Sequence, residues 1–156
     1  VDIIARIDSV YFYTVEDALK AVEDGQTITI MNKKGSEVGT ELEFSKTGTF
    51  TITGYAPDYK MPIITVNNET GKTVLNIADA TLAMAEIDAR KNATINVVDS
   101  VITGANGDDI VKAYYNGVIN VSGESEIDTP STGYTAYNGS LPAFSNSLFM
   151  FIIDVS

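Results

Sequence analysis

The sequence reads LNIAD at residues 75–79, INVVD at residues 95–99 and INVSG at residues 119–123. Each copy has an apolar residue, Asn, a second apolar residue, a variable residue, and then Asp or Gly. Weaker copies occur upstream at residues 50–54 and 28–32, so the five copies start at steps of 20 to 25 residues. A period in this range, filled with short β-branched strands, is typical of a solenoid.

A second set of short apolar segments precedes these copies, at residues 64–67, 87–90, 111–114 and 134–137. Each is followed by a polar corner that contains Asn, at Asn68, Asn92, Asn116 and Asn138. Asn and Gly suit such corners because they tolerate left-handed backbone angles. The alternation places Ile, Val and Leu inside the coil and leaves the Asn of each copy facing solvent.

The predicted fold is therefore a right-handed parallel β-helix, with a β-sandwich as the alternative because it also gives short strands separated by turns. Residues 1–13 alternate as a strand, and residues 14–22 form an amphipathic helix with Thr14 as its N-cap. This helix is expected to cap the stack. We predict one domain, with the strand and helix in residues 1–25, coils in 26–141, and a C-terminal cap or truncated coil in 142–156.

Composition excludes several functions. The chain of 156 residues has 21 acidic and 10 basic side chains, for a net charge of -11, which disfavours nucleic acid as a partner. It has no Cys and no His, so disulfides, thiol chemistry and imidazole bases are excluded. No apolar run is long enough to predict membrane insertion.

The N-terminal third resembles a family of surface proteins. Residues 10–19 read VYFYTVEDAL, residues 24–30 read DGQTITI, and residues 117–123 read GVINVSG. These segments resemble the opening and the coils of β-helix modules in large surface proteins of Gram-positive gut bacteria. The resemblance implies a pectate-lyase-like β-helix in an extracellular, secreted or cell-surface module that is non-catalytic or associated with carbohydrate, with adjacent domains of the same protein as neighbours.

Tyrosines are the candidate ligand-binding residues. Aligning the Asn-Gly corners places Tyr115 and Tyr137 at equivalent positions in successive coils, with Tyr114 and Tyr134 close by. Such rings form a surface ladder when exposed, and a flat ring with a hydroxyl suits the face of a sugar. Tyr55 and Tyr59 flank Pro57 in an expected loop, and they form a second candidate. The alternative is that these rings stabilise corners or fill the edge of the core.

Acidic residues offer weaker candidates. Asp108-Asp109 resembles the paired carboxylates of polygalacturonase-type hydrolases, with Asp88 and Asp99 on neighbouring coils, but residues 106–109 (NGDD) also form a natural turn. A lyase would need an Arg base, and Arg6 and Arg90 are the two Arg residues; Arg90 is equally suited to pair with Asp88. We assign no catalytic residue, no metal ligand and no cofactor, and only loosely bound Ca²⁺ stays open.

The leading functional hypothesis is a non-catalytic adhesion or glycan-binding module at the cell surface, with a polysaccharide or host glycan as its partner. A polysaccharide-degrading enzyme of the β-helix type is the first alternative. A structural spacer in a longer surface protein is the second. An enzyme needs three or more converging carboxylates, and a binding module needs exposed aromatic rings.

Overall fold

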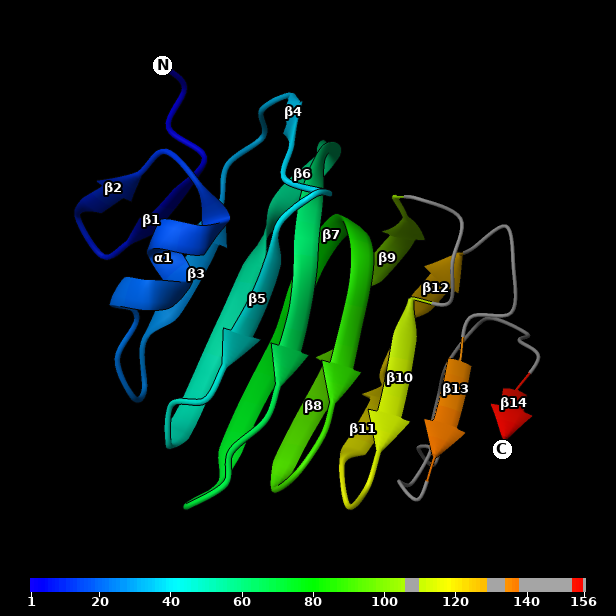
Figure 1. Ribbon diagram of the computed structural model, residues 1–156. Coiled ribbons are helices and arrows are strands. Elements are labelled where there is room, and N and C mark those ends of the chain that lie inside the picture. The colour runs from blue at the N-terminus through cyan, green and yellow to red at the C-terminus, as the bar shows by residue number, and fades with distance from the viewer. Residues whose placement is uncertain (106–109, 129–133, 138–152, 156) are drawn as a thin grey trace.

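The computed structural model describes residues 1–105, 110–128, 134–137 and 153–155. This part of the chain contains one short helix and fourteen strands (Figure 1). The elements in chain order are β1 (Ala5–Ile7), β2 (Val10–Phe12), α1 (Val15–Ala21), β3 (Thr27–Ile30), β4 (Gly35–Ser36), β5 (Glu41–Phe44), β6 (Gly48–Val66), β7 (Thr73–Ala89), β8 (Ala93–Val98), β9 (Val101–Gly104), β10 (Val111–Tyr114), β11 (Val118–Ser122), β12 (Glu126–Asp128), β13 (Tyr134–Tyr137) and β14 (Ile153–Val155).

The chain forms a β-solenoid of about 4 turns in which strands of successive coils pair in parallel (Figure 1). Leu75 pairs with Ile95 and Ile95 with Ile119, as the aligned copies predict. In the second set, Ile64 pairs with Ile87 and Ile87 with Val111. This coil-to-coil pairing confirms the solenoid and excludes the β-sandwich, which is built from antiparallel sheets.

The earliest copy lies two residues away from its predicted register. The alignment placed Ile28 opposite Phe50, whereas the structure pairs Ile28 with Ile52 and Phe50 with Leu75. A shift of two residues keeps every inward side chain inward, so the apolar pattern cannot detect it. Gly54 then lies against Ile30 at a φ of 119°, where an added Cβ would come within 2.2 Å of the Ile30 carbonyl oxygen.

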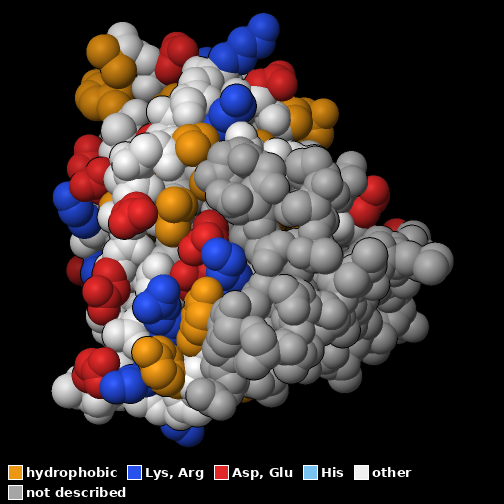
Figure 2. Space-filling model, turned by 45° about the vertical axis from the view of Figure 1, so that its right-hand side comes forward, with side chains coloured by type: hydrophobic (Ala, Val, Ile, Leu, Met, Phe, Trp, Pro, Cys, Tyr) orange, Lys and Arg blue, Asp and Glu red, His pale blue; other side chains and the backbone are white. Residues whose placement is uncertain are grey.

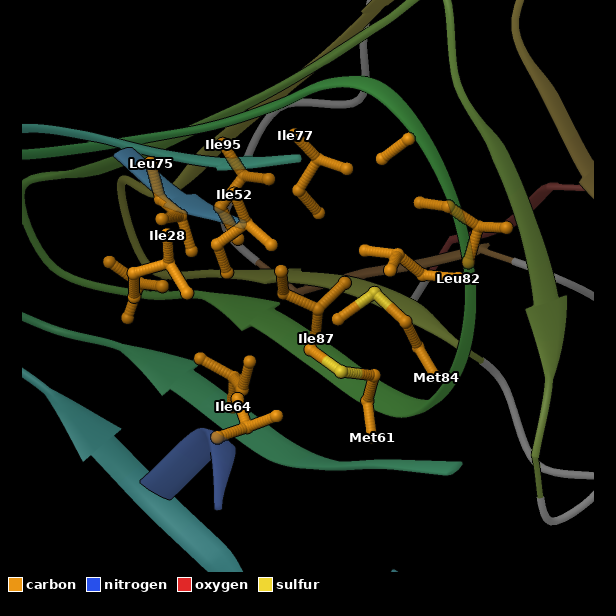
Figure 3. Close-up of a cluster of buried hydrophobic side chains, with 14 of the residues drawn as sticks. Ile28, Ile52, Met61, Ile64, Leu75, Ile77, Leu82, Met84, Ile87 and Ile95 are labelled. Atoms are coloured by element: carbon orange, nitrogen blue, oxygen red, sulfur yellow. The ribbon is translucent and has the colours of Figure 1, made fainter. Parts of the chain in front are cut away.

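Inward side chains of equivalent coil positions stack to form the core. Figure 3 shows Ile28, Ile52 and Ile77 from three coils, and each is at most 1% exposed. Neighbouring strands lie about 4.8 Å apart, so each side chain contacts its counterpart one coil away. Burial of one such side chain contributes about 1.5–3 kcal/mol, so the repeated apolar positions drive the stacking.

The N-terminal helix forms as predicted. The Thr14 hydroxyl accepts a hydrogen bond from the Asp17 amide at 3.0 Å, and Glu16 and Asp17 place negative charge in the first turn. Val15, Ala18 and Leu19 are buried against the first coil. The helix contacts β1, β2, β3 and β6, so it covers part of the N-terminal end of the stack.

The segment before the helix is a hairpin rather than the single strand predicted. β1 and β2 pair antiparallel, and β1 also pairs antiparallel with β3. The chain reverses at Asp8, whose φ of 51° is left-handed, a backbone state that Asp tolerates better than most residues. A short turn without Gly or Pro leaves the alternation unbroken, which is why the sequence pattern missed it.

The outward Asn residues form hydrogen-bonded ladders instead of only facing solvent. The Asn96 amide donates to Asn76 Oδ1, and the Asn120 amide donates to Asn96 Oδ1, both at 2.9 Å. At the next corner Asn116 donates to Asn92 Oδ1 at 3.2 Å. These bonds link the coils in addition to the backbone ladder.

The predicted division into residues 1–25, 26–141 and 142–156 stays a prediction. Of the last segment the structure describes β14, which pairs in parallel with β13, and the rest lies outside the described residues. In the described part of the chain no helix has the length and hydropathy needed to cross a membrane.

Candidate functional site: a charged and aromatic cluster

The C-terminal half of β7 and the adjacent β10 present an outward face of charged side chains. Ile87 and Ala89 point into the core, so Glu86, Asp88 and the following Arg90 point outward. Asp88 pairs in register with Lys112 of β10, and Tyr114 follows two residues later on the same face. We call Glu86, Asp88, Arg90, Lys112 and Tyr114 the charged cluster.

Opposite charges are paired within the charged cluster. Lys112 Nζ lies 2.6 Å from Glu86 Oε1, and Arg90 Nη2 lies 3.4 Å from Asp88 Oδ2. Figure 2 shows acidic and basic side chains side by side on the face of the molecule that it draws. The pairing between Asp88 and Arg90 is the alternative that the sequence left open for Arg90.

Two polar atoms of the charged cluster are buried without a hydrogen-bond partner among the described residues. They are Asp88 Oδ1 and Arg90 Nε, and the Asp88 side chain is only 1% exposed. Most buried polar atoms in proteins are hydrogen-bonded, and leaving one unsatisfied costs about 1–3 kcal/mol. The two buried atoms therefore add an energetic cost to this face.

The surroundings of the charged cluster shift the pKa values of three of its side chains. Burial, together with a hydrogen bond and charge repulsion from Glu86, raises the pKa of Asp88 to about 7, although Lys112 and Arg90 oppose the shift. Burial acts to lower the pKa of Lys112, but the hydrogen bond and charge of Glu86 outweigh it and raise that pKa. Burial also raises the pKa of Tyr114.

We expect the raised pKa of Asp88 to make the protein less stable as the pH rises. Between the ordinary pKa of 3.8 and about 7, the folded state binds the Asp88 proton more tightly than the unfolded state does. The contribution of this proton to the free energy of unfolding is therefore complete below pH 3.8 and is lost as the pH rises through 7. The loss is at most about 1.4 kcal/mol per pH unit. Urea unfolding of the wild type and Asp88→Asn between pH 5 and pH 8 measures this difference.

The variant should lose less stability than the wild type over this range, because Asn does not titrate. Titrating groups that do not interact with Asp88 behave alike in both proteins and cancel in the comparison. Parallel stability curves for the two proteins would contradict the assignment.

Aromatic rings border the charged cluster at the corner that follows β10. Arg90 lies over the Tyr114 ring, with 4.9 Å between its Cζ and the ring centroid. Tyr115 has a φ of 55° and is 52% exposed, and Lys91 Nζ lies 5.7 Å from its ring centroid. Tyr114 and Tyr115 are thus each accompanied by a cation from the previous coil.

The predicted tyrosine ladder is displaced by one residue. The structure pairs Tyr137 with Tyr114 and Tyr134 with Val111, so Tyr115 is not opposite Tyr137. In the sequence one residue separates Tyr114 from Asn116, whereas Asn138 follows Tyr137 directly. Aligning the Asn-Gly pairs therefore misplaced the strands by one residue. The side chains of Tyr134 and Tyr137 lie outside the described residues.

The two tyrosines of the second candidate site lie in different environments, one at the surface and one in the core. Tyr55 and Tyr59 lie within β6 and not in the predicted loop. Tyr55 is 60% exposed, but Tyr59 is only 5% exposed and its hydroxyl donates to Glu37 Oε2 at 2.7 Å. The ring of Tyr59 is therefore core packing, which is the alternative that the sequence left open.

The acidic candidates are not brought together in the described part of the chain. Asp108 and Asp109 lie outside the described residues. Asp99 occupies a corner, where Oδ1 accepts a hydrogen bond from the Glu124 amide at 2.9 Å. Among described residues no three acidic side chains gather as a metal site would require, and Arg6 belongs to β1 at the far end of the stack.

Sequence reasoning missed the charged cluster as a unit. Glu86 and Lys112 had no role in the prediction, although Glu86, Asp88 and Arg90 alternate with apolar residues in a segment of strand. That alternation was the available signal. It shows that the three residues share a face, but only the register shows that Lys112 and Tyr114 join them.

The fold and this face define the class of protein as a β-solenoid module with an outward charged and aromatic cluster. Comparison with known proteins adds no family: no family model, curated protein or solved structure matches the chain.

Proposed function

We propose that this domain is a non-catalytic glycan-binding or adhesion module of a cell-surface protein. The observation that carries the proposal is the exposed ring of Tyr115, which follows Tyr114 at a corner where Arg90 and Lys91 each lie over one ring. A ligand at this corner would meet a flat ring and hydrogen-bond donors together. Sugar hydroxyls suit such a surface, because each hydroxyl can donate and accept.

The rings supply the other half of sugar recognition. A sugar has apolar C–H faces and polar edges, and a tyrosine offers a flat apolar ring with a hydroxyl at its rim. Tyr115 is exposed, and the cations Arg90 and Lys91 next to the two rings add donors for ligand oxygens. The paired charges within the charged cluster favour a glycan recognised through its hydroxyls over a highly charged polymer.

A hydrolase has less support than a binding module. Glu86 and Asp88 form a carboxyl pair, but the third converging carboxylate expected of such an enzyme is missing from the described residues. A pure spacer leaves the exposed ring of Tyr115 without a role.

The resemblance of residues 10–30 to β-helix modules of Gram-positive surface proteins supports an extracellular location. Adjacent domains of the same protein are then further partners. The extracellular location and the adjacent domains are part of the proposal, and both depend on a role at the cell surface.

A glycan array tests the proposal, using the wild type beside Tyr115→Asn. Asn tolerates the positive φ of this corner, so the substitution removes the ring without adding backbone strain. We expect the wild type to bind one class of glycan and Tyr115→Asn to bind it about ten-fold more weakly or worse, a loss of about 1.4 kcal/mol.

Tyr55→Ala is the matched control, since Tyr55 is similarly exposed but lies on another part of the solenoid. It should bind like the wild type. Wild-type binding to no glycan would refute the proposal, as would equal losses in both variants. Release of reducing sugar from a bound glycan would favour the hydrolase.

A further inference from the structure

Strand β5 lies in the first coil, and one of its edges has no partner strand in the described part of the chain. Among the described strands it pairs with β6 alone, through bonds such as Asn67 N–H to the Phe44 carbonyl at 3.1 Å and Ile63 N–H to the Thr40 carbonyl at 3.0 Å. In a parallel pair, alternate residues point their backbone groups to opposite edges. The amides and carbonyls of Glu41 and Glu43 therefore point away from β6, and no protein group in the described chain binds them.

The free edge opens into a groove between β5 and α1. The groove has a volume of about 410 Å³, and Leu19, Leu42 and Phe44 supply its apolar lining. Leu19 and Phe44 are buried, whereas Leu42 is partly exposed. An apolar lining beside unpaired backbone groups is the arrangement that accepts an added strand.

The charges around the groove are not balanced. Lys20 is paired with Glu16 at 2.8 Å, and Lys46 Nζ donates to the carbonyls of Lys20 and Val22 at the end of α1. Glu41 and Glu43 are exposed and form no ion pair in the described chain. The carboxylates next to the free edge therefore lack cations, while both lysines of the groove are already engaged.

We propose that β5 binds an extended, basic peptide segment of a partner protein as an added strand. Its backbone would pair with the amides and carbonyls of Glu41 and Glu43. Alternate side chains would enter the apolar groove. The residues between them would lie opposite Glu41 and Glu43, with about 4.5–5.5 Å between the facing Cβ atoms. The partner segment thus alternates apolar and basic residues. This groove lies outside the charged cluster, so the inference does not depend on glycan binding.

Fluorescence anisotropy with labelled synthetic peptides tests the inference. The first probe alternates lysine and valine, the second replaces lysine by glutamate, and the third is the lysine peptide with N-methylated backbone amides. We expect binding of the first probe alone, because the second is repelled by Glu41 and Glu43 and the third cannot complete the strand pairing.

A charge-reversal variant, Glu41→Lys/Glu43→Lys, should bind the lysine peptide at least about ten-fold more weakly and should bind the glutamate peptide instead. Glu124→Lys/Glu126→Lys is the control for net charge, since it makes the same change in charge at two exposed residues of a distant coil. Undiminished binding of the N-methylated peptide would overturn strand addition. Failure of the lysine peptide to bind, or equal losses in the control, would overturn the site.

Discussion

Replacing Phe50 with alanine is expected to lower the free energy of unfolding by about 3–5 kcal/mol. Phe50 is 2% exposed and stacks in register on Leu75 of the next coil. Its ring also meets Phe44 edge to face, with 4.8 Å between centroids and an interplanar angle of 89°. Alanine would therefore lose the burial of a large ring and leave a cavity between the first two coils.

Urea unfolding followed by circular dichroism measures this loss. Phe50→Leu is the matched control, because it keeps most of the volume and should cost less than about 1.5 kcal/mol. Tyr55→Ala removes an exposed ring from the same strand and should change the stability by no more than about 0.5 kcal/mol. A Phe50→Ala cost as small as that of Tyr55→Ala would contradict the packing of this coil.

Replacing Glu37 with alanine is expected to cost about 2–4 kcal/mol. The buried Glu37 carboxylate accepts hydrogen bonds from the Val15 and Glu16 amides at 2.8 and 3.2 Å, and from the Tyr59 hydroxyl at 2.7 Å. It therefore caps α1 from outside the helix and ties it to β6. Alanine would leave two helix amides and a buried hydroxyl without their acceptor.

A double-mutant cycle separates the two roles of Glu37. Tyr59→Phe removes only the hydroxyl, and Glu37→Ala should cost less in that background because one unsatisfied group has already been removed. Strictly additive costs would show that the hydroxyl and the carboxylate do not interact. Loss of helical signal before the strands unfold would show that the cap mainly holds α1.

The repeated triplets were sufficient to predict the solenoid, because inward apolar residues at equivalent coil positions carry both the stacking and the sequence signal. The helix and its Thr14 cap were also readable, since their contacts are local. Glu37 was not, because its partners Val15 and Tyr59 are 22 residues away in either direction and no short pattern links them.

The candidate site was also predicted only in part, because its contacts join residues that are far apart in the sequence. Tyr114 and Tyr115 were chosen from their corner, but the cation accompanying each ring comes from the previous coil. Alignment of the Asn-Gly pairs placed Tyr115 opposite Tyr137, whereas the strand register pairs Tyr114 with Tyr137. The burial of Asp88 is a property of the assembled face and leaves no mark in the sequence.

Nuclear magnetic resonance titration tests the central claim most directly, with the isotope-labelled domain and the glycan that binds it best on the array. We predict amide shift changes confined to residues 86–91 and 112–116, weakened in Tyr115→Asn and retained in Tyr55→Ala. Shift changes centred on the Asn ladders or on the groove beside β5, with residues 86–91 silent, would contradict the charged cluster as the glycan site.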